Sequence, residues 1–267
     1  EKLAQEMGLR DHPVRQYIRW LGKAVRGDMG ISIEEKGPVF PILMEKFWNT
    51  LILAAAAGFL AVSVGLTLGI VAALKQDSIL DRAILLISMF GLSMPAYWLG
   101  LVLIFLLVVK VHWFPSTGMY SIIGGGGVID LLKHLALPAI AGSAVAAGII
   151  ARTSRTAMLE VLRQDFMTGL RAKGLSERAV FRHAFRNALP PITTMIGLQL
   201  AYVLLGSQIF IEIIFTWPGI GLQTFSAVFN RFDSFFDYFD LCWSFSARIS
   251  TYGHPTKHQW HAIMEDG

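Results

Sequence analysis

Four continuous apolar runs divide the chain, at about 50–74, 83–109, 135–151 and 191–215. A helix needs roughly 20 residues to cross the hydrocarbon core of a bilayer, and these runs are close to that length. They are continuous rather than alternating, which disfavours a membrane β-barrel. The pattern therefore predicts an all-α membrane protein, a polytopic helical bundle with about four membrane spans.

Details of three runs refine this prediction. The third run, 135–151, is short, so a helix buried in the protein core is the alternative there. In the second run, Pro95 lacks a backbone donor and is expected to kink the helix. Small residues recur every fourth position in the first and third runs: Ala57, Ala61, Gly65, Gly69 and Ala73, then Ala139, Ser143, Ala147 and Ala151. Such faces let helix backbones approach closely in lipid, and the alternative is the general enrichment of small residues in membrane helices.

Composition agrees with a membrane protein. The 267 residues are 54% hydrophobic and 16% charged, which is typical of multi-span membrane proteins and not of soluble enzymes. The net charge is +4, but no basic stripe with interleaved aromatic residues is present, so nucleic-acid binding is disfavoured. The single cysteine, Cys242, has no partner for an internal disulfide.

The basic residues predict the orientation, because loops rich in Lys and Arg stay in the cytoplasm. The loop after the third run carries Arg155, Arg163, Arg171, Lys173, Arg178, Arg182 and Arg186. We therefore place this loop in the cytoplasm of a multi-pass protein of the cell inner (plasma) membrane, and residues 1–48 outside. Within this outer segment, 14–25 has apolar residues at helical spacing, which suits an amphipathic helix on the membrane surface or an ordinary surface helix.

The loop 152–189 has the signals of a helix, a tight turn and a second helix. The third span's helix is expected to continue to Asp165. A short piece, 166–173, then leads to Gly174, which suits a helix C-cap. Ser176 is expected to be the N-cap of the next helix.

The second helix of this loop is expected to run to about Ala188 and to end at Pro190 and Pro191. Helix, turn and helix together make a compact knob, which suits docking of a soluble partner that moves the flanking spans. The alternative is a basic loop that lies against anionic lipid headgroups.

Sequence motifs carry a specific resemblance. The loop contains RAKGLSER at 171–178 and RNALPP at 186–191. These runs resemble the cytoplasmic coupling loop of binding-protein-dependent ABC transporter permeases, most of all the dipeptide, oligopeptide and nickel group. Further matching stretches are 16–21 with 27–32, 49–51, 93–100 and 215–221. The resemblance covers about residues 13–228, and Thr-Gly-Leu at 168–170 replaces the family's Glu-Ala-Ala.

The resemblance implies a permease subunit of an ATP-driven importer that forms half of the translocation pathway for short peptides. Its expected partners are a second permease subunit, separate ATP-binding ABC subunits and an extracytoplasmic solute-binding protein. The residues implied to couple to the ATPase are Phe166, Leu170, Arg171, Ala172, Lys173, Gly174 and Leu175. In this interpretation the chain is not an enzyme and has no catalytic residues.

The resemblance also implies a division of the chain. Residues 1–48 form an extracytoplasmic segment, 49–228 the permease transmembrane domain with its coupling loop 152–189, and 229–267 an atypical polar tail. A span before residue 1 and a last apolar span after about Val228 are expected in the family and are missing here.

Polar side chains in the fourth run are candidates for the substrate pathway. They are Gln199, Tyr202, Ser207 and Gln208, and hydrogen bonds between helices are the alternative role. Glu212, near the outer end of this run, suits a gate or substrate contact, or alternatively a carboxylate at the membrane interface.

Trp98, Trp113 and Trp217 are expected to anchor the protein at the membrane interfaces. The scattered histidines give no metal-ligand spacing, so the sequence predicts no metal site and does not favour nickel over peptide. No Gly-Lys-Ser/Thr follows Gly124–Gly127, so this chain is expected to hold no nucleotide or other cofactor.

Two other classes are considered. A secondary transporter would need a charged residue in the middle of a span to carry a coupling ion, and the apolar runs have none. An intramembrane enzyme would need a zincin motif, a nucleophile elbow or a pair of aspartates within the spans, and none is present.

Overall fold

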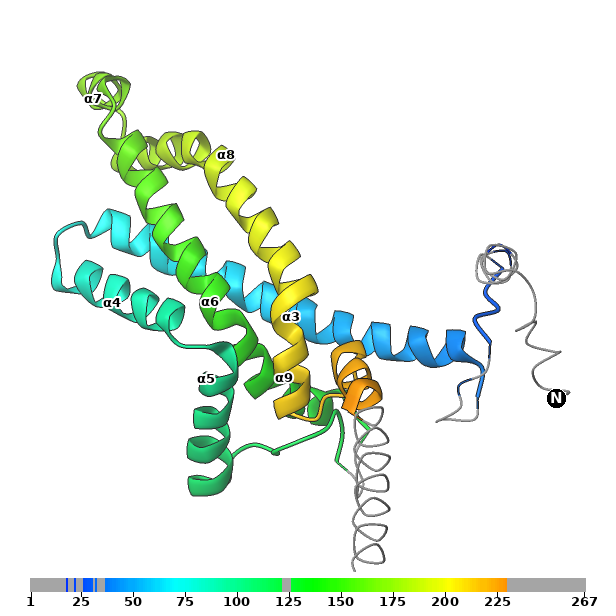
Figure 1. Cartoon of the computed structure of the whole chain (residues 1–267). Helices are drawn as coiled ribbons and strands as arrows, with labels where there is room; N and C mark the ends of the chain where they lie inside the picture. The colour runs from blue at the N-terminus through cyan, green and yellow to red at the C-terminus, as the bar shows by residue number, and fades with distance from the viewer. Residues whose placement is uncertain are drawn as a thin grey trace, which may run out of the picture. The chain divides into compact units, whose positions relative to one another are not determined.

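The computed structural model describes residues 18, 22, 26–30, 32, 37–121 and 126–229. The chain divides into two compact units, 1–222 and 223–267, and the second is described only for residues 223–229. The predicted amphipathic segment 14–25 thus lies outside the described residues apart from Ile18 and Gly22, as does the predicted tail apart from Phe229. The labelled elements are α3 (Val39–Leu74), α4 (Ile79–Ser93), α5 (Ala96–Leu103), the π-helix η1 (Ile104–Lys110), α6 (Val128–Leu162), α7 (Asp165–Ala172), α8 (Glu177–Tyr202), the π-helix η2 (Val203–Ser207) and α9 (Gln208–Ile214) (Figure 1).

The helices confirm the all-α membrane fold. In the described part of the chain, α3 and α6 are each long and apolar enough to cross a membrane. A third crossing is counted if α4 and the run Ala96–Lys110 form one broken span. The fourth predicted span lies in the continuous helical run of α8, η2 and α9, and none of these three elements taken singly is among the helices that meet the same criterion. Length and apolarity alone therefore identify two or three crossings.

Pro95 does more than kink the second predicted span. α4 ends at Ser93, Met94 takes an extended conformation, and Pro95 is the N-cap of α5. The two helices are bent by 104° at this break. A proline cannot donate the backbone hydrogen bond that would continue α4, and the residue before it avoids the helical conformation.

The helix α6 is the centre of the first unit and contacts α3, α4, α5, α8 and α9 (Figure 1). Its closest approach to α3 uses the predicted small-residue face. Gly65 of α3 lies against the backbone of Ala147, and Gly69 lies against the backbone of Ala151 and the side chain of Ser154. Because glycine leaves no side chain between the backbones, the two long helices pack directly on each other. The third predicted span is therefore both long enough to cross a membrane and the core of the unit.

Substituting alanine for Gly69 is expected to destabilise the protein. The added Cβ would lie 2.5 Å from the carbonyl oxygen of Ala151, which neither helix can relieve without moving. Overpacking of this kind costs about 1–3 kcal/mol. The matched control is Gly197→Ala in α8, where no atom lies within 4 Å of the added methyl group. Thermal unfolding in detergent would measure both variants, and equal stability of the two would contradict the packing described here.

The prediction that Pro190 and Pro191 end a helix is wrong, because α8 continues through both to Tyr202. The helix is held on both sides of the proline pair by a row of buried residues that packs on α6 and α7: Val180, Ala184, Ala188 and Ile192. The hydroxyls of Thr193 and Thr194 each donate to the carbonyl oxygen of Pro190 at 3.0 Å. Tertiary packing therefore outweighs the two missing backbone donors.

Candidate functional site

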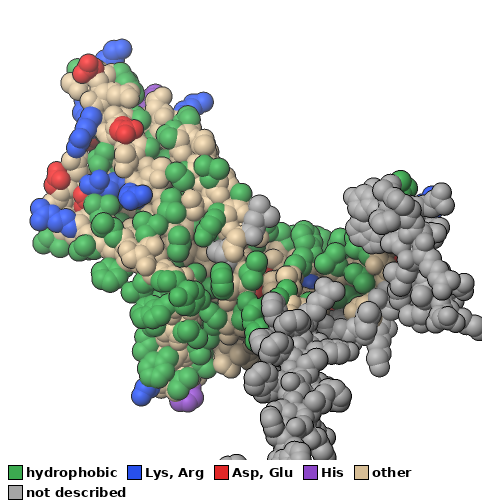
Figure 2. All heavy atoms as spheres, viewed as in Figure 1, with side chains coloured by type: hydrophobic (Ala, Val, Ile, Leu, Met, Phe, Trp, Pro, Cys, Tyr) green, Lys and Arg blue, Asp and Glu red, His purple; other side chains and the backbone are tan. Residues whose placement is uncertain are grey.

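The loop between α6 and α8 forms a knob at one end of the first unit, with the short helix α7 at its tip (Figure 1). Figure 2 shows Lys, Arg, Asp and Glu side chains gathered at this end, whereas hydrophobic side chains cover much of the remaining surface on this face. The exposed cations of the knob are Arg163, Arg171, Lys173, Arg178, Arg182 and Arg186. We call this end of the unit the α7 end.

The start of α7 differs slightly from the prediction. Asp165 does not continue α6, which stops at Leu162, but opens α7 in its first turn. Gln164 between them takes an extended conformation and interrupts the helical backbone. Ser176 is the N-cap of α8 as predicted, although the structure gives its side chain no capping hydrogen bond.

Gly174 ends α7 in the predicted way. Its φ is +80°, in the left-handed region that L-residues avoid. The Gly174 N–H donates to the carbonyl oxygen of Arg171 at 2.9 Å, and the Leu175 N–H donates to that of Leu170 at 3.3 Å. These two bonds define a Schellman motif. The side chains of Leu170 and Leu175 both pack against the buried hydrophobic cluster of α6, α7 and α8, and an apolar contact of this kind is usual in the motif. The turn is therefore tight and of defined geometry.

A buried methionine fixes α7 to the rest of the unit. Met167 has no exposed surface and packs with Met158 and Val161 of α6, and with Val180 and Ala184 of α8. Sequence reasoning missed it, because it considered α7 only as an exposed tip. The neighbouring side chain, Phe166, is 42% exposed.

The predicted coupling residues fall into two groups. Phe166, Arg171, Ala172, Lys173 and Gly174 are exposed at the tip. Leu170 and Leu175 are half-buried and contact the cluster around Met167. Arg171 also approaches Glu177 at 3.3 Å, but both side chains are exposed, so this pair contributes little to stability.

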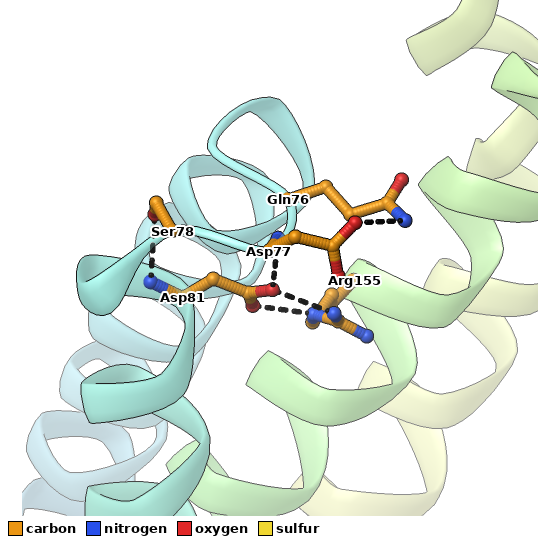
Figure 3. A network of polar contacts seen from close by, with 5 residues as sticks. All are labelled: Gln76, Asp77, Ser78, Asp81 and Arg155. Carbon is orange, nitrogen blue, oxygen red and sulfur yellow. Dashed lines mark hydrogen bonds and ion pairs between the residues drawn. The ribbon is translucent and has the colours of Figure 1, made fainter.

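An ion pair with a buried carboxylate and a partly exposed guanidinium joins the α7 end of α6 to the start of α4 (Figure 3). The Arg155 guanidinium donates to both carboxylate oxygens of Asp81, with Nε–Oδ1 at 2.6 Å and Nη2–Oδ2 at 2.7 Å. The Asp81 side chain is 3% exposed and also accepts from the backbone N–H of Asp77 at 3.0 Å. Such bidentate pairs fix both the distance and the orientation of the groups they join.

The turn before Asp81 is shaped to hold this pair. Asp77 has φ +63°, a conformation that Asp tolerates better than most residues, and Gln76 donates to its carboxylate at 3.1 Å. Ser78 caps α4 by accepting from the Asp81 N–H at 3.2 Å. Sequence reasoning counted Arg155 only as a loop charge. The missed signal is that Asp81 lies just before the second apolar run and Arg155 just after the third. Both residues are therefore predicted to lie at the same side of the membrane.

The predicted pathway residues do not form one group. Tyr202 is 54% exposed and lines a cavity of about 400 Å³ together with Met94, Pro95 and Phe210. Gln208 is only 2% exposed, and in the described structure neither of its amide atoms has a hydrogen-bond partner. Gln199 donates to the sulfur of Met195 at 3.7 Å, within its own helix. Of the three candidates, Tyr202 is therefore the one that lines this cavity.

Comparison with known proteins identifies relatives over most of the chain. A family model described as "Binding-protein-dependent transport system inner membrane component" matches residues 65–245. The oligopeptide transport system permease protein AppB of Bacillus subtilis is 37% identical over 233 residues, covering 86% of this chain and 73% of that protein. The di/tripeptide transport system permease protein DppB of Pseudomonas aeruginosa is 38% identical over 244 residues, covering 84% and 72%. The dipeptide transport system permease protein DppB of Escherichia coli is 37% identical over 254 residues, covering 86% and 74%.

The fold also resembles a solved transporter. A chain of the MetNI methionine ABC transporter, in an inward-facing conformation, superposes with a TM-score of 0.50 at 19% sequence identity. The match covers 74% of this chain and 92% of that chain. At this identity the likeness supports the arrangement of helices and no finer property.

Proposed function

Because the chain belongs to the family of binding-protein-dependent transport system inner membrane components, and so is a permease subunit of an ATP-driven ABC importer, we propose that it forms half of a translocation pathway for short peptides and is driven through α7. The proposal that the subunit is driven through α7 rests on one observation, which is how the knob is built. α7 buries Met167 in the hydrophobic cluster and leaves the neighbouring Phe166 42% exposed. A helix held in this way transmits a push at its tip to α6 and α8 together.

The proposed partners follow from this arrangement. A separate ATP-binding subunit would receive the exposed Phe166 and the cations of the tip in a groove. Exposed aromatic anchors surrounded by polar groups are typical of docking contacts. A second permease subunit would complete the pathway, and a solute-binding protein would deliver the substrate from outside.

The proposed topology places the α7 end in the cytoplasm of a multi-pass inner-membrane protein. The gathering of charged side chains at this end supports it, because basic residues favour the cytoplasmic side (Figure 2). In the same proposal, 1–48 is extracytoplasmic, 49–228 is the transmembrane domain with its coupling loop 152–189, and 229–267 is a tail.

Peptide is the proposed substrate class because the named relatives transport oligopeptides, di/tripeptides and dipeptides. The test is uptake into vesicles that contain the chain with the other subunits of its transporter and its solute-binding protein. ATP-dependent uptake of labelled tri-alanine is expected, with ⁶³Ni²⁺ as the comparison solute. Uptake of nickel but not peptide would replace the substrate class, and uptake without ATP would replace the mechanism with secondary transport.

Substitutions at two adjacent residues of α7 distinguish an effect on docking from an effect on folding. Phe166→Ala is expected to lower peptide uptake about tenfold, since truncating an interface anchor often costs more than about 1–2 kcal/mol. Its own folding should change by less than about 0.5 kcal/mol, because the side chain is exposed. Met167→Ala is the matched control, and it should destabilise the subunit by about 2–5 kcal/mol through the cavity that it leaves.

Uptake assays, thermal unfolding in detergent and co-purification with the ATPase would measure both variants. Normal ATPase binding and normal uptake by Phe166→Ala would show that α7 docks elsewhere or not at all.

A further inference from the structure

Glu212 lies in α9 with none of its surface exposed. Its Oε1 accepts a hydrogen bond from the Thr50 hydroxyl at 2.6 Å, and its Oε2 accepts from the backbone N–H of Leu222 at 3.1 Å. Both partners are neutral. Burying a carboxylate is costly unless hydrogen bonds compensate, so the site is built around this side chain. The carboxylate thus lies inside the protein, and its depth in the membrane stays a prediction.

Two residues of α3 connect this carboxylate to the loop that follows α9. The Thr50 hydroxyl donates to Glu212 and at the same time accepts from the Ile220 N–H at 2.9 Å. Asn49 donates through Nδ2 to the carbonyl oxygen of Pro218 at 2.9 Å. The carbonyl oxygen of Asn49 accepts from Trp217 Nε1 at 2.8 Å. Sequence positions almost 170 residues apart are thus joined by reciprocal hydrogen bonds.

The loop fits the carboxylate closely. A Cβ at Gly219 would overlap the Glu212 carboxyl group, and a Cβ at Gly221 would meet both that group and the backbone of Ile209. Trp217 is fully buried and packs with Leu53 of α3 and Ile211 of α9. The expectation that Trp217 anchors the protein at a membrane interface is therefore wrong, because its indole is an internal contact. We call Asn49, Thr50, Glu212 and Trp217 the outer lock.

The outer lock lies far along α3 from the α7 end, since α3 continues for 24 residues beyond Thr50 to Leu74. It joins α3 to α9, and α9 follows α8 through η2 without a break. The connector after η1 is tied to the same place, because the Gly118 N–H donates to the carbonyl oxygen of Phe215 at 2.9 Å. These contacts hold α3, the connector after η1, and α9 with the segment after it together at one end of the unit.

We propose that Glu212, Thr50 and Asn49 are positioning residues that fasten the segment 215–221 to α3, so that this end of α3 and α9 moves as one body during transport. The inference rests on the proposed function, since it requires a transport cycle. A push on α7 reaches α8 and α9, and the outer lock passes that motion to α3 at the opposite end. Glu212 acts here through the loop and not by touching substrate, because it has no exposed surface in this conformation.

Two matched pairs of variants test the outer lock in the complete transporter with its solute-binding protein. Glu212→Met keeps the length of the side chain but removes both acceptors, whereas Glu212→Gln keeps an acceptor for Leu222 and can donate to the Thr50 hydroxyl. Thr50→Val removes the bridging hydroxyl, and Thr50→Ser keeps it. The readouts are tri-alanine uptake, ATP hydrolysed per peptide transported, and co-purification of the subunits.

Glu212→Met and Thr50→Val are each expected to raise the ATP hydrolysed per peptide about tenfold, a change in proportion to the loss of a hydrogen bond to a charged group. Assembly should be unchanged, and the Gln and Ser variants should stay within about twofold of wild type. The double variant should be no worse than either single one, because both remove the same connection.

If assembly, uptake and ATP hydrolysis all fell in proportion while the ATP hydrolysed per peptide stayed unchanged, the proposal would be overturned. The outer lock would then have a purely structural role. Wild-type ratios in Glu212→Met would overturn it as well. Uptake of tri-alanine by the wild-type complex is measured first. If the wild-type complex does not transport it, the result counts against the proposed substrate and not against the outer lock.

A crosslink tests the rigid-body motion without removing Glu212. Thr50→Cys and Ile220→Cys are combined with Cys242→Ser and joined by a short reducible thiol crosslinker. These positions are adjacent, since Thr50 Oγ1 lies 2.9 Å from the Ile220 backbone nitrogen. Because Thr50→Cys removes the bridging hydroxyl, the crosslinked protein is compared with the same variant before crosslinking, and uptake is expected to persist at least at that variant's own rate. Arrest of uptake that is restored by reduction would show that the loop and α3 separate in the cycle, and would overturn the proposal.

Discussion

Valine at position 174 is expected to reduce peptide uptake by about five- to thirtyfold while the subunit still inserts into the membrane. Gly174 adopts φ +80° to end α7. The left-handed conformation costs an L-residue about 1–2 kcal/mol, and β-branched residues are especially poor in it. No atom lies within 4 Å of the added Cβ, so the effect would come from the backbone and not from a clash. The turn would open and α7 would lose its fixed direction.

The control for this experiment is Gly174→Asn. Asparagine tolerates the left-handed conformation, so it should keep most of the uptake although it adds a larger side chain than alanine would. Uptake and co-purification with the ATPase would be measured for the Val, Ala and Asn variants. An order of activity that follows side-chain size instead of backbone preference would contradict the role assigned to the turn.

Breaking the ion pair between Asp81 and Arg155 is expected to have the largest effect on stability. Asp81→Asn leaves the Arg155 guanidinium without its partner, and Arg155→Gln leaves the Asp81 carboxylate buried and unpaired. Removing one member of a fully buried pair typically costs about 3–5 kcal/mol, and because Arg155 is 19% exposed we expect the lower end of that range. We expect both single variants to unfold at lower temperature in detergent and to lose uptake, since α4 would no longer be fixed to α6 at the α7 end.

The double variant Asp81→Asn with Arg155→Gln is the matched control. It removes both charges and leaves two amides that can hydrogen-bond to each other, so it should recover part of the stability lost in either single variant. A double-mutant cycle on the unfolding temperature would measure this coupling. Additive effects of the two substitutions would mean that the pair seen in Figure 3 does not hold the two helices together.

Local sequence signals were strong for the knob and weaker for its anchoring. Gly174 and Ser176 could be placed because a helix end and a helix start depend on a few neighbouring residues. The face of small residues on α3 was predictable for the same reason, since its spacing of four follows from the helical repeat. Met167 was not singled out, because an apolar residue in a short polar helix does not reveal whether it is anchored or exposed.

Local reasoning failed where the outcome depends on distant partners. The proline pair Pro190 and Pro191 predicted the end of a helix, yet burial against α6 and α7 keeps α8 helical on both sides of it. Trp217 was expected at a membrane interface, yet its indole donates to Asn49 inside the protein. In both cases the packing energy of the surrounding helices outweighs the preference of the residue itself.

By itself the sequence determined that this chain is a helical membrane protein, which segments are apolar and where the turn at Gly174 closes, because hydropathy and capping are properties of neighbouring residues. Only the tertiary structure decided which buried charges are compensated. Asp81 meets Arg155 across two helices, and Glu212 meets Thr50 across 162 positions of the chain. A buried charge is tolerated only when specific partners surround it, and which residues become its partners is fixed by how the helices pack.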